Sequence, residues 1–150
     1  MTVTTDPTAI APGSLAASVM RYGDLMIETA ARAKAGVSDD ELWVPISRLV
    51  ATETFRRVGP LREEWDWQGY TRFLTPWART TEFNTIFRRI SETGNLVFLE
   101  LTEHNTHNGV LSVVNSLSLY RFDAGGRIDH LQIYLQLSPE AAVALSQMQV

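Results

Sequence analysis

The sequence predicts an α+β fold in which N-terminal helices pack on a curved antiparallel sheet that encloses a pocket. Over the first half of the chain, apolar residues recur three and four positions apart, which is the period of a helix. From Phe83 onward they alternate with polar residues, which is the period of a strand. Asn108–Gly109 lies between two alternating runs and predicts a tight hairpin. Helices followed by a meander of strands are typical of a sheet covered on one face.

The first two helices are marked by their ends. A long helix is expected over 14–35, with Ser14 as its N-cap and Gly36 as its end. The S-x-x-E motif at 38–41 has the form of a capping box and predicts a second helix. Pro45 should kink or split that helix, because proline lacks the amide hydrogen and clashes with the preceding turn.

A short strand and a third helix are expected next. The strand covers 52–58 and is ended by Gly59–Pro60, and Asp66 is the expected N-cap of the helix. Pro76 should bend or terminate this helix. Its face is aromatic, which favours a core or lid role over a cofactor site; it consists of Tyr70, Phe73, Leu74 and Trp77.

Four long strands are expected after the third helix. They cover 83–91, 96–107, 110–122 and 128–137. If Asn108–Gly109 is a two-residue turn, the register follows by counting outward from it. The expected pairs are Glu103 with Val114, Leu101 with Ser116, and Leu99 with Ser118.

The bulk composition excludes several classes of protein. A chain of 150 residues fits one domain, expected over 14–150 after a flexible tail at 1–13. The net charge is −4 and no basic stripe is present, which argues against binding nucleic acid. The absence of cysteine excludes disulfides and thiolate metal sites. Neither a secretory signal nor a membrane-spanning run is recognisable, so a cytoplasmic protein without membrane contact is expected.

Glu103 is the most informative residue of the predicted sheet. It continues an apolar row formed by Leu99 and Leu101, and small serines opposite those leucines leave space on that face. A glutamate buried in such a space has a raised pKa, as a general acid or base requires. The alternative is that Glu103 lies near the strand end and faces solvent or forms a structural ion pair.

Three segments resemble the SnoaL-like and ketosteroid-isomerase-like branch of the nuclear transport factor 2 superfamily. They are Val19-Met20-Arg21-Tyr22, the segment from Phe55 to Pro60, and the hairpin from Tyr120 to Ile128. The resemblance covers nearly the whole chain from Ser14 to Leu137. It implies a cone, in which helices fold over a strongly curved sheet and leave a deep apolar pocket.

The resemblance also assigns candidate roles. Tyr22 matches a helix-one tyrosine that donates to an oxyanion in ketosteroid isomerases, whereas Arg57 and Ser118 stand where those enzymes have acids. Glu103 matches the first acid of limonene-epoxide hydrolases, but Leu101 and Ile133 replace the arginine and second acid of that set. In polyketide cyclases of the SnoaL type an acid–base carboxylate lies in an apolar pocket, a role that Glu103 can fill.

Two functions are predicted as alternatives. One is cofactor-free acid–base catalysis on an apolar or aromatic molecule, of the isomerase, cyclase or epoxide-hydrolase type, by Glu103 and Tyr22, with Arg57 either a partner of Glu103 or a surface arginine. The other is a non-catalytic binding or assembly domain, since fold alone does not decide between them. No metal site and no cofactor are expected, and a homodimer is expected to bury the sheet face opposite Glu103. The expected ligand-binding residues are Phe55, Tyr70, Phe73, Trp77, Leu99, Leu101, Val114, Ser116, Ser118, Tyr120 and Ile133.

Overall fold

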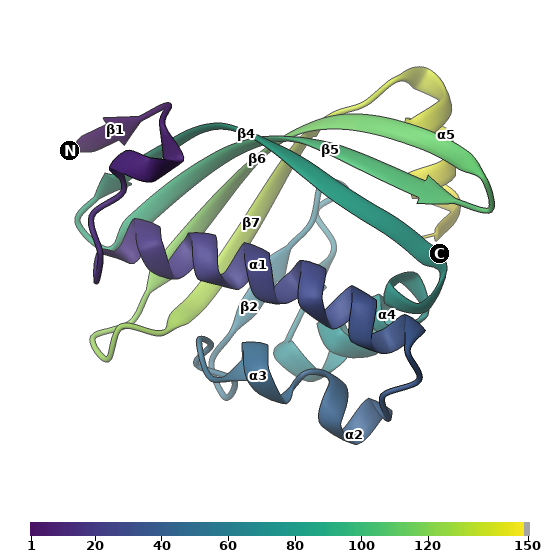
Figure 1. Cartoon of the computed structure of the whole chain (residues 1–150), viewed down its shortest axis with the longest axis horizontal. Coiled ribbons are helices and arrows are strands. Elements are labelled where there is room, and N and C mark those ends of the chain that lie inside the picture. Colours follow the sequence, from purple (N-terminus) through teal and green to yellow (C-terminus); the bar gives the residue numbers. More distant parts are fainter. Residues whose placement is uncertain (149–150) are drawn as a thin grey trace.

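Helices and strands segregate along the chain as the sequence predicts. The computed structural model describes residues 1–148 and has the α+β architecture, with the N-terminal helices beneath a mostly antiparallel sheet (Figure 1). The helices before the long strands are α1 (Leu15–Lys34), α2 (Asp39–Leu42), α3 (Val44–Ser47) and α4 (Trp67–Thr80). The long strands are β4 (Thr81–Thr93), β5 (Leu96–His107), β6 (Val110–Phe122) and β7 (Ile128–Gln136), close to the predicted ranges.

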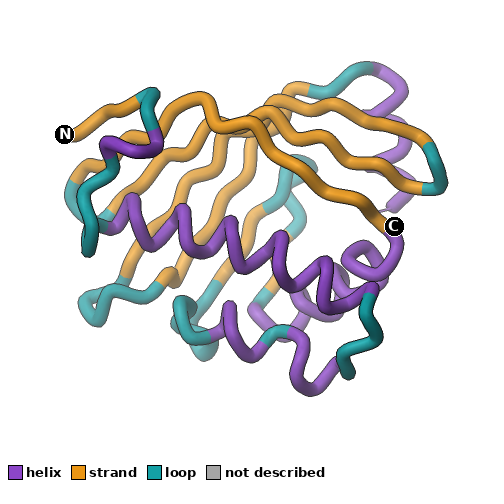
Figure 2. The backbone as a smooth tube through the Cα atoms, viewed as in Figure 1, coloured by secondary structure: helices purple, strands orange, loops and turns teal. Residues whose placement is uncertain are grey.

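The sheet has seven strands in the order β1-β4-β5-β6-β7-β2-β3. All neighbours are antiparallel except β2 (Arg56–Val58), which runs parallel to β7. The pairing register shifts between Phe87 and Arg89 in β4 and between Arg121 and Phe122 in β6. Such bulges bend the strand that carries them, in keeping with the arched sheet that spans the helices in Figure 2.

Caps fix α1 and α4 where the sequence predicts them. Ser14 Oγ accepts from the Ala17 amide, and an Asp66 carboxylate oxygen accepts from the Gly69 amide. Gly36 ends α1 with φ +90°, and the Gly36 and Val37 amides donate to the last helical carbonyls, as in a Schellman motif. Pro76 does not terminate α4, which continues to Thr80.

Pro45 splits the second predicted helix into α2 and α3, with Trp43 between them and the proline in the first turn of α3. The capping box at Ser38 is not formed, because that side chain makes no capping hydrogen bond. The strand expected at 52–58 is shorter than predicted. Only β2 is extended, since the Thr54 and Phe55 amides bond back to Ala51 in a turn.

The chain ends hold elements that periodicity did not reveal. Residues 1–13, predicted as a flexible tail, contain β1 (Thr2–Thr4), which pairs with β4, and a short 3-10 helix at Pro7–Ala9. The two-residue β3 (Glu64–Trp65) and the helix α5 (Pro139–Met148) were also not predicted. Among the described residues, no helix is long and apolar enough to cross a membrane.

The predicted register of the β5–β6 hairpin is confirmed. Glu103 pairs with Val114, Leu101 with Ser116, and Leu99 with Ser118. These pairs lie on the concave face of the sheet, toward α1 and α4. The sheet therefore presents one carboxylate and two serines to the space beneath the arch.

Candidate functional site

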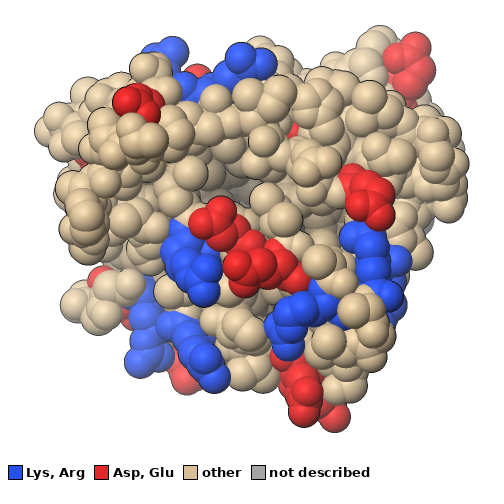
Figure 3. Space-filling view, viewed as in Figure 1, with Lys and Arg blue, Asp and Glu red and all other residues tan. Residues whose placement is uncertain are grey.

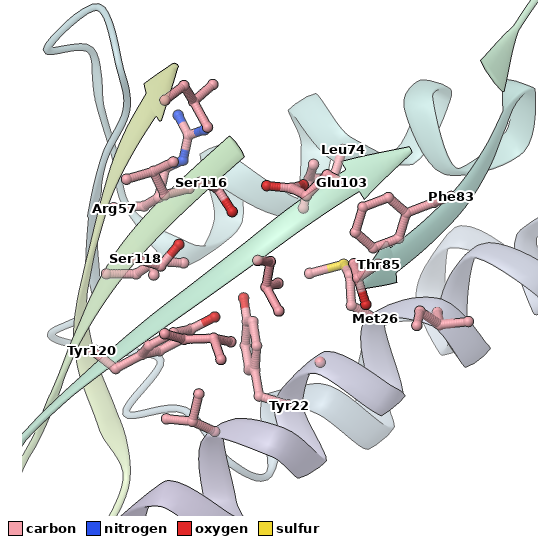
Figure 4. Close-up of a pocket in the computed structure, with 18 of the residues that line it drawn as sticks. Tyr22, Met26, Arg57, Leu74, Phe83, Thr85, Glu103, Ser116, Ser118 and Tyr120 are labelled. Atoms are coloured by element: carbon pink, nitrogen blue, oxygen red, sulfur yellow. The ribbon is translucent and has the colours of Figure 1, made fainter. Parts of the chain in front are cut away.

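A cavity of about 270 Å³ lies between the helices and the concave face of the sheet (Figure 4). One wall comes from α1 and α4, and the other from β4 to β7. Three catalytic candidates line this cavity: Tyr22 from the helical wall, Glu103 from the sheet wall, and Arg57 of β2. The predicted ligand-binding residues that line it are Tyr70, Phe73, Trp77, Leu99, Leu101, Ser116, Ser118, Tyr120 and Ile133.

Two predicted ligand-binding residues do not line the cavity. Phe55 is fully buried behind its wall, with its ring stacked on Tyr70 at 6.2 Å and edge-on to Trp67 at 5.2 Å. Phe55 therefore supports Tyr70 from behind. Val114 is buried across the strand pair from Glu103 but does not reach the cavity surface.

Several lining residues were missed by the sequence analysis. Met26 follows Tyr22 by one helical turn, and Asn105 follows Glu103 on the same strand face, so helical and strand periodicity carried signals for both. Leu145 comes from α5, a helix that was not predicted. Other wall residues that were not among the predicted ligand-binding residues include Leu74, Phe83, Thr85, Leu131 and Leu135, although the strand pattern predicts that Leu131 and Leu135 face the helices.

Glu103 presents a carboxylate to a largely apolar space. Among the described residues no arginine, lysine or histidine lies within ion-pair distance of it, in contrast to the carboxylates of five pairs elsewhere. Burial raises the pKa of Glu103 above its usual value of 4.5, and the nearby Ser116 hydroxyl opposes part of that rise. Ser116 Oγ lies near this carboxylate but has no partner of good hydrogen-bonding geometry among the described residues.

Three tyrosines gather around the inner part of the cavity. The rings of Tyr22 and Tyr120 meet edge to face at 5.6 Å between centroids. Burial raises the pKa of Tyr22, Tyr70 and Tyr120. Tyr70 and Tyr120 raise the pKa of Tyr22 further, and Tyr70 raises that of Tyr120. All three hydroxyls are therefore protonated at neutral pH and can donate hydrogen bonds.

Arg57 is buried and is neither a surface arginine nor a partner of Glu103, the two roles considered from the sequence. Its Nη1 donates to Glu63 Oε1 at 2.8 Å, and its guanidinium lies over the Tyr70 ring at 5.0 Å from the centroid. The ion pair packs against Gly59, where a Cβ atom would overlap both Glu63 Oε1 and Arg57 Nη1. Gly59 is thus required for the pair.

Unsatisfied polar atoms concentrate at the cavity. Six buried side-chain nitrogen or oxygen atoms lack a hydrogen-bond partner within the described part of the chain, and four of them belong to lining residues. Buried polar atoms are normally paired, so this concentration indicates groups that bind a ligand. The four are Tyr22 Oη, Arg57 Nε, Asn105 Oδ1 and Ser116 Oγ.

The arrangement fits acid–base chemistry better than metal chemistry. Within residues 1–148, no three histidine or acidic side chains come close enough to hold a metal ion. The cavity instead combines one carboxylate of raised pKa with several neutral or cationic donors. A proton acceptor facing hydrogen-bond donors is the pattern that enolisation and related reactions require.

No protein-family model and no curated protein matches this sequence. Solved structures do match. A BvnE pinacolase from Penicillium brevicompactum superposes with a TM-score of 0.66 at 10% identity, covering 90% of this chain and 93% of that one. A steroid delta-isomerase from Pseudomonas aeruginosa superposes with a TM-score of 0.59 at 18% identity, covering 89% and 87% of the two chains.

A third match confirms the expected fold type. An NTF2-like protein of unknown function from Exiguobacterium sp. 255-15 has a TM-score of 0.61 at 16% identity, covering 79% of this chain and 98% of that one. The helices beneath an arched sheet, the cavity between them and these likenesses agree. This chain has the nuclear transport factor 2-like (NTF2-like) fold.

Proposed function

We propose that this protein binds an apolar or aromatic small molecule in the cone-shaped cavity and catalyses cofactor-free acid–base chemistry on it. The reaction is of the isomerase, cyclase or epoxide-hydrolase type. The observation that carries the proposal is Glu103, a carboxyl group that faces the cavity with a raised pKa and without an ion-pair partner among the described residues. A carboxyl group whose pKa is raised by burial is a stronger base than a solvated one, as a proton-transfer role requires.

The donors opposite Glu103 suggest how a reaction proceeds. The Glu103 carboxylate removes a proton from a carbon next to a substrate carbonyl, and the C–H electron pair moves to the carbonyl oxygen as an enolate. Tyr22 Oη and Arg57 Nε, both without partners among the described residues, donate hydrogen bonds to that oxygen. If a carbon–carbon double bond is conjugated with the enolate, protonated Glu103 returns the proton to the far carbon of the dienolate. Alternatively, the enolate carbon attacks a second carbonyl and closes a ring, and the resulting alkoxide takes the proton from Glu103.

The charges of the site favour a neutral ligand. Arg57 is already balanced by Glu63, and that ion pair lies at the wall of the cavity. An anionic ligand would therefore meet no uncompensated positive charge, and it would repel Glu103. The cavity of about 270 Å³ has room for about two fused rings, since an apolar cavity of about 150 Å³ accommodates benzene.

The structural neighbours support catalysis in a pocket of this kind. The matched proteins include one named as a steroid delta-isomerase and one named as a pinacolase. At 18% and 10% identity they share the fold with this chain and do not supply its substrate. The residues of the cavity carry the rest of the argument.

The alternative is a non-catalytic domain that binds a small molecule. It is favoured by Leu101 and Ile133, two apolar side chains that line the cavity where the resemblance to epoxide hydrolases calls for an arginine and an acid. Glu103 would then serve as a hydrogen-bonding anchor for the ligand. Catalysis and binding differ in whether Glu103 exchanges a proton with carbon.

Deuterium exchange into 2-tetralone tests this difference. This neutral bicyclic ketone matches the expected size, and NMR in D₂O follows exchange of the protons next to its carbonyl. We expect the wild-type protein to accelerate exchange and Glu103→Gln to lose about 10²–10⁴-fold of that acceleration, since glutamine keeps the shape but does not accept the proton.

Glu100→Gln is the matched control. Glu100 lies on the same strand but on the opposite face, where it pairs with Arg89, so its loss should leave exchange unchanged. Equal exchange by wild type and Glu103→Gln contradicts the catalytic role. Binding of 2-tetralone by wild type without faster exchange favours the binding domain.

A further inference from the structure

The middle of α1 borders the cavity with a stripe of residues that reaches solvent. Met20, Gly23 and Ile27 lie on one side of the helix, and all three line the cavity. Met20 and Gly23 are half-buried and Ile27 is exposed, whereas Tyr22 and Met26, on the side toward the sheet, are buried. The cavity therefore extends to the surface along this stripe.

The facing rim is formed by β4. Phe83 and Thr85 line the cavity and are only half-buried, although they point to the concave side of the sheet. Farther along the same strand Ile90 is fully buried beneath the start of α1. Figure 3 shows a hollow in the surface above the middle of α1, below the front strand of the sheet. We call this opening the α1–β4 mouth, bounded by Met20, Gly23 and Ile27 on α1 and by Phe83 and Thr85 on β4.

Nothing in the local structure requires a glycine at position 23. It lies inside the helix, where glycine is less favourable than alanine, and its φ is not positive. A Cβ atom built at this position meets no atom within 4 Å, so close packing does not exclude a side chain either. The space that a side chain would occupy is the α1–β4 mouth itself.

Both ends of α1 are held in place. At its start the Ala16 amide donates to Glu92 Oε1 of β4 at 2.7 Å. At its end Arg79 Nη1 of α4 donates to the Ala33 carbonyl at 3.2 Å. Because the helix is anchored on both sides of the mouth, the width of the mouth depends on the side chains at its rim.

We propose that ligands enter the cavity through the α1–β4 mouth and that Gly23 keeps this mouth wide enough to admit them. Gly23 is then a residue that limits the size of the ligand. The inference rests on the cavity of the proposed function but does not require proton transfer by Glu103.

Cysteine labelling tests the route without any knowledge of the ligand. The chain contains no cysteine, so Ser118→Cys places a single thiol on the β6 wall of the cavity. Methyl methanethiosulfonate, a small neutral reagent, labels this thiol at a rate that mass spectrometry follows. Adding Gly23→Trp should slow labelling by about 10-fold or more, because entry then waits for local opening of the structure.

Two matched variants separate blocking from disturbance of the helix. Gly23→Ala should leave labelling unchanged and raise the melting temperature, because alanine favours the helix and meets no neighbour. Arg21→Trp places the same bulk on the exposed face of α1 and should leave labelling unchanged. If the melting temperature of Gly23→Trp is below that of the wild type, the labelling rate of Gly23→Leu is measured instead, and the same slowing is expected.

Equal labelling in a folded Gly23→Trp or Gly23→Leu protein would overturn the proposal. Slower labelling in Leu145→Trp, with no effect at position 23, would place the entrance under α5 instead. Neither result depends on turnover, so a failure of this inference is distinct from a failure of the catalytic proposal. The thiol-labelling measurement does not use the rate of ketone exchange.

Discussion

The two faces of β5 place two glutamates in opposite settings. Glu103 points into the cavity, where burial raises its pKa and no described residue forms an ion pair with it. Glu100, three residues earlier, lies on the convex face and pairs with Arg89 at 2.9 Å, with both side chains about half-exposed. Of these two glutamates on β5, Glu103 is thus unpaired and desolvated, whereas Glu100 is paired and in contact with solvent.

The difference comes from what the neighbouring strands place beside each residue. Glu103 faces Thr85 of β4 and Val114 of β6, with Ser116 nearby, and none of these carries a positive charge. On the convex face the bulge after Phe87 brings Arg89 opposite Glu100. A carboxylate without compensation persists in a fold only where something offsets its cost, which is why we assign function to Glu103.

The buried Arg57–Glu63 pair extends the comparison to a third carboxylate, and removal of Glu63 should have the largest effect on stability. Glu63→Gln leaves the buried Arg57 guanidinium without its counter-charge and should cost about 3–5 kcal/mol of unfolding free energy. Glu100→Gln, which breaks the exposed pair with Arg89, should cost less than about 1 kcal/mol.

Urea unfolding followed by circular dichroism measures both variants. Equal losses in the two would contradict a difference between buried and exposed pairs. The Glu63→Gln protein should also bind 2-tetralone more weakly, since Arg57 holds Tyr70 at the cavity wall through its cation–π contact.

The convex face gives the second prediction. This face exposes apolar side chains from β4, β6 and β7, and large exposed apolar patches are rare on monomers. The exposed side chains are Ile86, Leu111, Val113, Leu117 and Tyr134. We propose that a second copy of this chain covers this face. Leu117→Lys should weaken the dimer by about 10-fold or more, because it buries an unpaired charge in the interface.

Analytical ultracentrifugation at micromolar concentration measures the dimer. Leu61→Lys is the control, since Leu61 is also exposed but lies outside the convex face, in the turn between β2 and β3. A wild-type protein that sediments as a monomer would contradict the assembly, and so would a Leu117→Lys protein that remains as dimeric as wild type.

The long elements of the fold could be predicted because local signals and tertiary structure agree there. Ser14, Asp66 and the Asn108–Gly109 turn mark boundaries by their own hydrogen-bonding or backbone preferences, and the structure keeps those boundaries. The misses lie where long-range pairing decides. β1 is extended because it pairs with β4, and the chain turns at 52–55 because the Thr54 and Phe55 amides donate to the Ala51 carbonyl.

Strand alternation and the hairpin register were sufficient to predict the sheet side of the site. These two regularities place Glu103, Ser116 and Ser118 on one concave face. The partner of Arg57 could not be predicted, because the Glu63 contact depends on the tight turn at Gly59 that returns the chain between β2 and β3. No sequence periodicity encodes a contact set by the path of a loop.

The smallest expected effect is the pH dependence of stability that Glu103 contributes. The pKa of Glu103 is raised in the folded protein above its ordinary value of 4.5, so the folded state holds the proton to higher pH than the unfolded state does. Stability from this group is therefore fully present below pH 4.5 and is lost as pH rises through the folded pKa.

Glu103→Gln removes that loss. Its melting temperature relative to wild type should thus be similar in acid and should rise toward neutral pH. Melting curves of the two proteins between pH 4 and pH 8 measure this, and a difference between them that does not change with pH would mean that Glu103 is not desolvated in the folded protein.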